Sequence, residues 1–269
     1  SDDVRLSDKL LAGPTETYRK IRNTLKYLLG NVFDFDPGKD AVPYERMPEI
    51  ERYVLLRLMS LDCEVRGAYS AYAFRKAAIS LVDFCNLTLS AFYLDVRKDA
   101  LYTLKPGDPL RRAAQTVMWE CLIRLLKLAA PILSFTCEEA WLELRRALLE
   151  RGAGSTLAES VFLHAMGPAP EIWRDAPLAA RWMRFLSVRE EILKKIEELR
   201  AGKQLGSSLQ AGVRLRSSSA EEFEFLRAIG PETLAETAIV SSLELLAPGQ
   251  GERLVVERAP GAKCPRCWR

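Results

Sequence analysis

The chain has 269 residues, 48% of them hydrophobic, which suffices for one large or two modest hydrophobic cores and excludes a disordered or fibrous protein. Its 39 basic and 36 acidic residues give a net charge of +3, which lacks the strongly basic balance of most nucleic-acid binders, so any such function requires local clustering. No apolar run reaches the roughly 18 residues of a membrane span, and the charged first residues do not form a signal peptide, which predicts a cytoplasmic protein without a membrane anchor.

Residues 1 to about 165 are predicted to form an all-α bundle. Apolar residues recur there at intervals of three and four, and no stretch alternates in the manner of a strand. The helical patterns occupy residues 17–33, 47–65, 73–99, 110–130 and 137–152.

The last of these patterns carries a predicted capping box. The hydroxyl of Thr136 is expected to accept from the amide three residues on, while Glu139 reaches back. Trp141 falls on the apolar side of the same helix and is expected in the core. We also expect the cysteines inside the helical patterns to be small buried hydrophobes in a reducing compartment; they are Cys63, Cys85, Cys121 and Cys137.

The proline-rich stretch at residues 163–177 predicts a domain boundary. A further amphipathic helix follows at residues 178–206. Two short alternating runs, at residues 211–218 and 252–258, predict strands, and helical spacing separates them. This part is therefore expected to contain a small α+β unit.

Catalytic patterns are missing from the sequence. His164 is the single histidine, which excludes a histidine acid-base pair, a Ser-His-Asp triad and a two-histidine metal site. There is no glycine-rich phosphate-binding loop of the P-loop kind. We therefore expect no active site in this chain.

The first helical pattern presents a polar face opposite its apolar one. The polar face carries the basic stripe, defined as Arg19, Arg22, Asn23 and Lys26. An ordinary solvated helix face explains such a stripe, and so does a row of phosphate-binding cations. Tyr18 and Tyr27 beside it would suit RNA, where rings and amides meet unstacked bases. The stripe by itself leaves both interpretations open.

The segment KCPRCW at residues 263–268 contains two cysteines at metal-ligand spacing. Cys264 and Cys267 are either two surface cysteines or two of the four tetrahedral ligands of a zinc site. A redox role for the pair would require a thioredoxin-like βαβ context, which the sequence does not predict.

Stretches of the chain, taken in order, resemble bacterial isoleucyl-tRNA synthetases. They are YRKIRNTLKYLLGNVFDFDP, LSAFYLDVRKDALYT, APILSFTCEEAW, KQLGSSLQAGVRL and KCPRCW. The third is similar to an element shared by the valine, leucine and methionine enzymes, whereas the second and the last resemble the isoleucine enzyme in particular. The resemblance covers essentially the whole chain.

The resemblance implies a mainly α fold, the anticodon-binding helical bundle of class I aminoacyl-tRNA synthetases followed by a small α+β domain. Residues 1–165 would be the anticodon-binding domain, residues 166–258 the C-terminal junction helix and small α+β unit, and residues 259–269 a truncated zinc-binding tail. Pro14 stands where the family continues a helix, and we expect a kink or a restart there.

The partners and cofactors implied are those of the whole enzyme. The chain would bind isoleucine tRNA and join the catalytic domain of the same protein, as a monomer and without catalysis of its own. ATP and magnesium would belong to that catalytic domain. The family's zinc module has a second cysteine pair further on, so Cys264 and Cys267 would form an incomplete site, with zinc absent or weakly held.

Two functional hypotheses follow. In the first, the bundle recognises the anticodon stem and loop, with phosphates on Arg19, Arg22 and Lys26, a base edge on Asn23, and a base stacked on Trp268. In the second, the chain is a structural brace for the catalytic domain and binds little RNA itself, which the mild net charge favours.

Overall fold

The computed structural model describes residues 7–153 and 157–260. The chain divides into two compact units, and the division falls between Asp175 and Ala176. The first unit is a bundle of helices, and the second combines helices with a small sheet, which confirms the expected mainly α class with an α+β part.

The first unit is built from helices of unequal length. Its long helices are α1 (Asp8–Asn31), α2 (Glu49–Ser70), α3 (Phe74–Asp83), α6 (Pro109–Ala129) and α7 (Ser134–Glu150). A π-helix, η2 (Phe84–Tyr93), continues α3 and leads into α4 (Leu94–Val96) and α5 (Lys98–Thr103). Short 3-10 turns complete the unit at η1 (Tyr44–Arg46), η3 (Val161–Leu163) and η4 (Glu171–Trp173).

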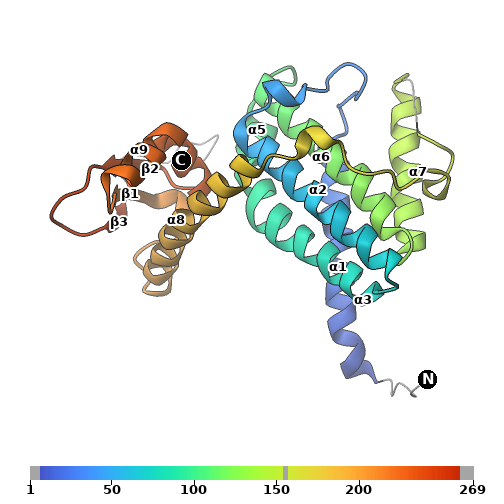
Figure 1. Ribbon diagram of the computed structural model, residues 1–269, viewed down its shortest axis with the longest axis horizontal. Helices are drawn as coiled ribbons and strands as arrows, with labels where there is room; N and C mark the ends of the chain where they lie inside the picture. Colours follow the sequence, from blue (N-terminus) through green and yellow to red (C-terminus); the bar gives the residue numbers. More distant parts are fainter. Residues whose placement is uncertain (1–6, 154–156, 261–269) are drawn as a thin grey trace. The chain divides into compact units, whose positions relative to one another are not determined.

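Helix α6 runs through the centre of the first unit and packs against α1, α2 and α7 (Figure 1). It begins at Pro109, whose missing N–H costs nothing in a first turn, and the Asp108 carboxylate accepts from the Leu110 amide at 2.9 Å. Its apolar residues face the neighbouring helices on several sides, so burial of apolar surface holds the bundle together.

A buried ion pair joins α2 to the segment that follows η2. The Arg97 guanidinium donates to both oxygens of the Glu51 carboxylate at 2.5 and 2.8 Å, and the Tyr93 hydroxyl donates to the same carboxylate at 3.2 Å. All three side chains are buried. Because a buried charge without a partner is costly, this arrangement strongly favours one packing of η2 against α2.

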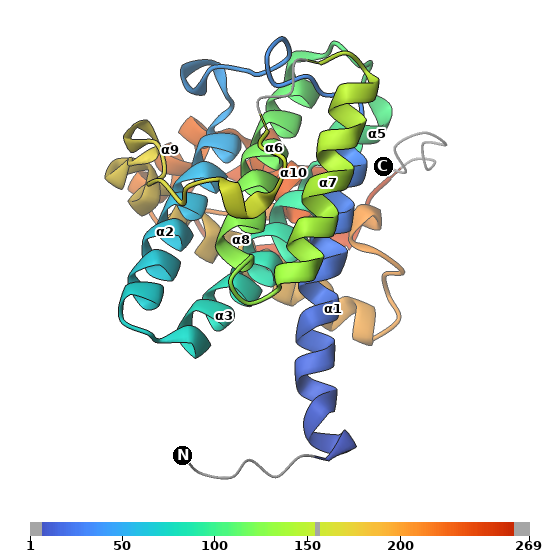
Figure 2. The ribbon, with the colours of Figure 1, turned by 90° about the vertical axis from the view of Figure 1, so that its right-hand side faces the viewer.

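Helix α1 contradicts the expected restart at Pro14, whereas the expected kink stays a prediction. The helix begins at Asp8, after the Ser7 cap, and continues through Pro14 to Asn31. Every side chain described in residues 9–20 is exposed, and the first turns of α1 extend beyond the other helices of the unit (Figures 1 and 2). Because these turns are exposed, the carbonyl freed by Pro14 is accessible to water, and this accounts for a helix that continues through the proline.

The capping box predicted at Thr136 is wrong. Helix α7 begins two residues earlier, at Ser134, and its N-cap, Leu133, makes no side-chain capping hydrogen bond. Thr136 therefore lies inside the first turn, where its hydroxyl is 3.1 Å from the hydroxyl of Tyr18. The core position of Trp141 is confirmed, since its side chain is fully buried and its Nε1 donates to the Ala158 carbonyl at 2.9 Å.

The cysteine prediction holds for three of the four helical cysteines and fails for one. Cys85, Cys121 and Cys137 are buried, but Cys63 is exposed. The buried position beside it belongs to Asp62, whose carboxylate accepts from the Arg124 guanidinium at 2.8 Å and from the Ala169 amide at 3.2 Å. An acidic residue satisfied by these partners takes the inward place on α2.

One apolar segment also departs from the sequence analysis. Among the described residues, Phe74–Val96 is long and apolar enough to cross a membrane by length and composition, and its most apolar 18-residue window has a mean hydropathy of 1.5. Ser80, Asp83 and Asn86 break its apolar run, yet the average over that window stays high. Half of its most apolar stretch is buried in the structure, where α3 and η2 pack on α2, so core packing accounts for this composition.

The second unit starts with the long helix α8 (Ala176–Ala201) and the turn η5 (Ser208–Gln210). The remaining elements are β1 (Ala211–Arg216), α9 (Ala220–Ile229), α10 (Pro231–Ala238), β2 (Ser242–Leu246) and β3 (Leu254–Arg258). The sheet has the order β2-β1-β3, with β1 parallel to β2 and antiparallel to β3. Parallel strands need a crossover, which α9 and α10 provide.

The two predicted strands are confirmed as β1 and β3, whereas β2 has no counterpart in the prediction. Its five residues alternate only weakly between exposed and half-buried positions, and β2, like β3, lies at an edge of the sheet. In the central strand the alternation is clear, since Val213 and Leu215 are buried and Arg214 between them is exposed. The burial of β1 thus follows the two-residue period of a strand.

Candidate nucleic-acid interface

The basic stripe lies on the exposed face of α1. The side chains of Arg19, Arg22, Asn23 and Lys26 are exposed, as the sequence predicts, while Ile21, Leu25 and Leu28 are buried beneath them. The 3.6-residue period of the helix produces this separation. The stripe is thus available to a partner.

The three cations of the basic stripe differ in whether they form an ion pair with a carboxylate. Arg19 donates to Glu16 at 2.9 Å, an exposed pair one turn apart that contributes little to stability. Within residues 7–153 and 157–260, Arg22 and Lys26 form no ion pair within 4.0 Å. Arg22 and Lys26 can therefore bind an anion without first breaking a contact.

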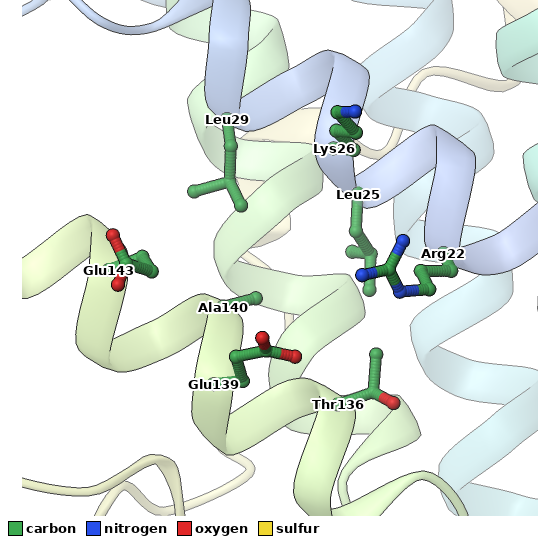
Figure 3. Close-up of a pocket in the computed structure, with 8 residues that line it drawn as sticks. All are labelled: Arg22, Leu25, Lys26, Leu29, Thr136, Glu139, Ala140 and Glu143. Carbon is green, nitrogen blue, oxygen red and sulfur yellow. The ribbon is translucent and has the colours of Figure 1, made fainter.

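Two hollows flank α1, and the stripe is divided between them. The first, the α7 groove, has a volume of about 140 Å³ and is drawn in Figure 3. Helix α1 contributes one wall and α7 the other; the lining residues are Arg22, Leu25, Lys26, Leu29, Thr136, Glu139, Ala140 and Glu143. Arg22 and Lys26 thus face this side of the helix.

The α7 groove is electrically mixed. Glu139 and Glu143 stand on the wall opposite Arg22 and Lys26, above an apolar floor (Figure 3). A phosphate inside the groove would meet these two carboxylates, which repel it. The favourable position for a phosphate is consequently the outer, solvent side of Arg22 and Lys26.

The second hollow, the η2 pocket, lies on the other side of α1 and is larger, at about 370 Å³. It falls within the range of roughly 300–1,000 Å³ that is usual for small-ligand sites, and the α7 groove does not. Its lining residues are Lys20, Asn23, Thr24, Tyr27, Asn86, Ser90, Leu94, Asp95 and Lys98. Asn23, which the sequence places in the basic stripe, therefore belongs to this pocket.

Hydrogen bonds hold parts of the η2 pocket in place. The Thr24 hydroxyl donates to the Lys20 carbonyl at 3.0 Å and lies 3.5 Å from the Ser90 hydroxyl. The Tyr102 hydroxyl donates to the Tyr27 hydroxyl at 3.4 Å, and burial raises the pKa of Tyr27 above its ordinary value. Tyr27 is therefore a neutral wall of the pocket at physiological pH.

Five of the nine residues that line the η2 pocket lie outside α1, and none of these five is predicted from the sequence as part of a site. Asn86 and Ser90 lie on η2, and Lys98 lies on α5; only the packing of these segments beside α1 brings them near Asn23. The signal that could have indicated them is the row of polar residues within an otherwise apolar segment. On a regular helix such a row is also typical of a solvated face.

The single histidine, His164, packs against the core and accepts a backbone hydrogen bond. The Nε2 of His164 accepts from the Ala158 amide at 3.3 Å, and its ring contacts the edge of Trp141 with centroids 5.0 Å apart. Burial lowers the pKa of His164. A neutral imidazole that accepts a hydrogen bond fits a role in fixing the loop after α7.

The proposed zinc ligands Cys264 and Cys267, and the proposed stacking residue Trp268, lie outside the described residues. In the described part of the chain, no group of three or more His, Cys, Asp and Glu side chains is placed to hold a metal ion. Burial raises the pKa of Cys85 and of Cys137 to about 12. Because metal binding requires the thiolate, these buried thiols are unsuited as zinc ligands.

A helical bundle that presents unpaired cations and two open hollows along one helix is suited to bind RNA. A family described as the anticodon-binding domain of tRNA ligases matches residues 51–215, more than half of the chain, and the chain belongs to this family. The match includes η2, α4 and α5 but begins after α1.

Over its full length, the chain is similar to bacterial isoleucine--tRNA ligases. It is 40% identical to that of Bordetella parapertussis over 268 residues, which are 100% of this chain and 28% of the relative. It is likewise 40% identical to the ligases of Desulfotalea psychrophila and Moorella thermoacetica, over 99% of this chain and 29% of each relative. The chain thus spans less than a third of these relatives and corresponds to their C-terminal part, which confirms the resemblance.

Proposed function

We propose that this chain recognises the anticodon stem and loop of isoleucine tRNA. Its membership in the anticodon-binding family supports an RNA partner, and its similarity to isoleucine ligases supports the choice of tRNA. The observation that carries the proposal is that Arg22 and Lys26 are exposed on α1, that neither has an ion-pair partner among the described residues, and that both stand beside Asn23.

The cations of α1 would supply affinity, and neutral groups would supply discrimination. Phosphate contacts position a nucleic acid but carry no sequence information, which is read from base edges. Arg22 and Lys26 are the better phosphate ligands, because Arg19 is shared with Glu16. Asn23 is an amide with both donor and acceptor, which suits a base edge.

The chemistry of aminoacylation would belong to the rest of a longer protein. ATP, magnesium and isoleucine would bind there, and this chain would contribute no covalent step. A zinc ion on Cys264 and Cys267 would need two ligands besides this pair, since zinc prefers four. We further propose a monomer in the cytoplasm, which size-exclusion chromatography with light scattering and cell fractionation would test.

A gel-shift titration tests RNA recognition and specificity together. The chain should retard isoleucine tRNA and should bind a version with an altered anticodon more weakly. Arg57→Ala is a matched control for substitutions in the basic stripe, since Arg57 is an exposed arginine on α2 and lines neither hollow. Equal affinity for both tRNAs would leave only nonspecific RNA binding.

A brace for the catalytic domain is the second candidate, and one observation favours it. The first turns of α1 expose Leu10 by 60% and Leu11 by 42%, and the relatives are much longer than this chain. Leu10→Ser with Leu11→Ser should then lower the melting temperature of the full-length ligase and leave that of this chain unchanged. Equal effects on both proteins would contradict the brace.

A further inference from the structure

The η2 pocket contains unused hydrogen-bonding groups. Neither the Asn23 nor the Asn86 side-chain amide makes a hydrogen bond within residues 7–153 and 157–260. Each amide carries two donors and an acceptor, and the two project from different helices into one hollow. Such a pair can contact one planar ligand edge from two sides.

We propose that the η2 pocket holds one unstacked nucleotide of single-stranded RNA, with its base edge on Asn23 and Asn86 and its phosphate on Lys20. This assignment rests on the proposed RNA-binding function and specifies where a base would be read. Sequence-specific RNA recognition usually takes unpaired bases out of the stack in this way.

The charge of the pocket fits a phosphodiester. Lys98 is paired with Asp95 at 2.5 Å, so their charges largely compensate each other. Lys20 lines the same pocket and has no ion pair among the described residues. The pocket lining therefore includes one lysine without an ion-pair partner among the described residues, which matches the single negative charge of one phosphate.

The walls of the pocket fit the faces of a base. Tyr27 offers an aromatic ring held through its hydroxyl by Tyr102, and Leu94 offers an apolar side chain. A ring held in one position loses little entropy when a base packs on it, and base-aromatic stacking tolerates any base. The walls would accordingly bind a base, and the amides would select which one.

The helix type adds an independent observation. Asn86 and Ser90 lie on the π-helix η2, a geometry that is rare and frequently found at functional sites. The α7 groove is lined by α1 and α7 and not by η2, is smaller, and carries two glutamates along one wall. An RNA strand could thus contact Arg22 and Lys26 with its backbone and place one base on the opposite side of α1.

The test pairs Asn86→Ala with Leu87→Ala. Leu87 is the next residue on η2, is 66% exposed and does not line the pocket, so its variant controls for disturbance of the π-helix. Melting temperatures verify that both variants fold. Affinities are measured for the isoleucine tRNA anticodon stem-loop and for a series in which one loop nucleotide at a time is abasic.

We expect Asn86→Ala to bind the intact stem-loop about 3- to 10-fold more weakly, the size of a lost hydrogen bond. At one loop position the abasic change should weaken the wild type about tenfold or more, as for a lost stacked base. At that position alone, the penalty should shrink in Asn86→Ala, because both changes remove the same contact. In Leu87→Ala, the loss of affinity caused by each abasic change should equal the loss measured for the wild type.

A second measurement separates this proposal from the function on which it rests. A short single-stranded oligoribonucleotide is titrated into the ¹⁵N-labelled chain while the Asn23 and Asn86 side-chain amide signals are followed. Shifted signals without stem-loop binding would support the pocket and overturn anticodon recognition. If the stem-loop binds but the amide signals do not shift, and if the abasic losses of affinity are the same in Asn86→Ala as in the wild type, the proposed nucleotide site is wrong and anticodon recognition stands.

Two further outcomes are decisive. If neither RNA binds, both proposals are wrong. If a free nucleoside monophosphate shifts the amide signals at the same concentration as the oligoribonucleotide, the pocket serves a small ligand, and the assignment to an RNA strand is overturned.

Discussion

The hydroxyl groups of Tyr18 and Thr136 lie 3.1 Å apart and connect α1 to α7 across 118 positions of the chain. Thr136 also lines the α7 groove, two helical turns from the far end of its acidic wall at Glu143. The contact therefore holds the exposed part of α1 beside the helix that forms one wall of the candidate interface.

This contact predicts a coupled effect on stability. Thr136→Ala should lower the free energy of unfolding by about 0.5–1 kcal/mol, a small loss because the bond is exposed. Tyr18→Phe should cost less in the Thr136→Ala background than alone, as measured by chemical denaturation of the double-mutant cycle. Thr17→Ala, an exposed neighbour on α1, is the control. Strictly additive losses would show that the two hydroxyls do not interact.

Arg22 should contact phosphate. Arg22→Ala should weaken binding of isoleucine tRNA and reduce the log-log slope of affinity against salt by about one, because one phosphate contact releases about one counterion. Arg19→Ala should change the slope less, since Arg19 is shared with Glu16. Filter binding at several salt concentrations measures both, and an unchanged slope for Arg22→Ala would make Arg22 solvated surface.

Trp141 should contribute to the stability of the fold and not to tRNA recognition. Trp141→Ala removes a fully buried ring and the hydrogen bond to the Ala158 carbonyl, so unfolding should become easier by about 3–5 kcal/mol. Trp141→Phe retains part of the packing and should cost less. Urea denaturation measures both variants. A neutral Trp141→Ala with lost tRNA binding would instead assign the residue to recognition.

The second unit should lose stability in acid through Glu222. Hydrogen bonds from Arg253, at 2.9 Å to each carboxylate oxygen, together with those from Ser218, lower the pKa of Glu222 to about 2 from an ordinary 4.5. A carboxyl with a depressed pKa stabilises the fold above its unfolded pKa, so this contribution is complete above pH 4.5 and is lost as pH falls towards 2.

Glu222→Gln should abolish that part of the pH dependence and cost about 2 kcal/mol at pH 6. Urea unfolding at pH 6 and pH 3, followed through amide signals of β1, provides the measurement. Glu224→Gln is the matched control, because Glu224 lies on the same helix in an exposed pair with Arg227. If Glu224→Gln lost as much of the acid sensitivity as Glu222→Gln, the pH dependence could not be assigned to Glu222.

Zinc should not bind tightly to this chain. Only Cys264 and Cys267 have ligand spacing, and two thiolates leave half of a tetrahedral site unfilled. Elemental analysis after dialysis should find well under one zinc per chain, and extension of the chain by a second Cys-x-x-Cys pair after Arg269 should raise the content to one. Only with that extension should Trp268→Ala weaken RNA binding. One tightly held zinc in the present chain would contradict this expectation.

Local patterns predicted much of the fold, and their failures have physical causes. The period of apolar residues located the bundle helices and the burial of Trp141, because a helix repeats its buried face every turn. The same period placed Cys63 inside, whereas Asp62 takes that place with the help of Arg124 from α6. A partner from another helix can reverse the burial of two neighbouring residues, and no local pattern records it.

The candidate interface shows the same limit. The exposure of Arg22, Asn23 and Lys26 follows from their spacing on one amphipathic helix, which needs no tertiary information. Their division between two hollows depends on α7 and η2, which pack on opposite sides of α1. Asn86 is 63 positions from Asn23 in the sequence, and only the folded bundle brings it to the same pocket, because burial of apolar surface, and not the polar groups themselves, sets which helices become neighbours.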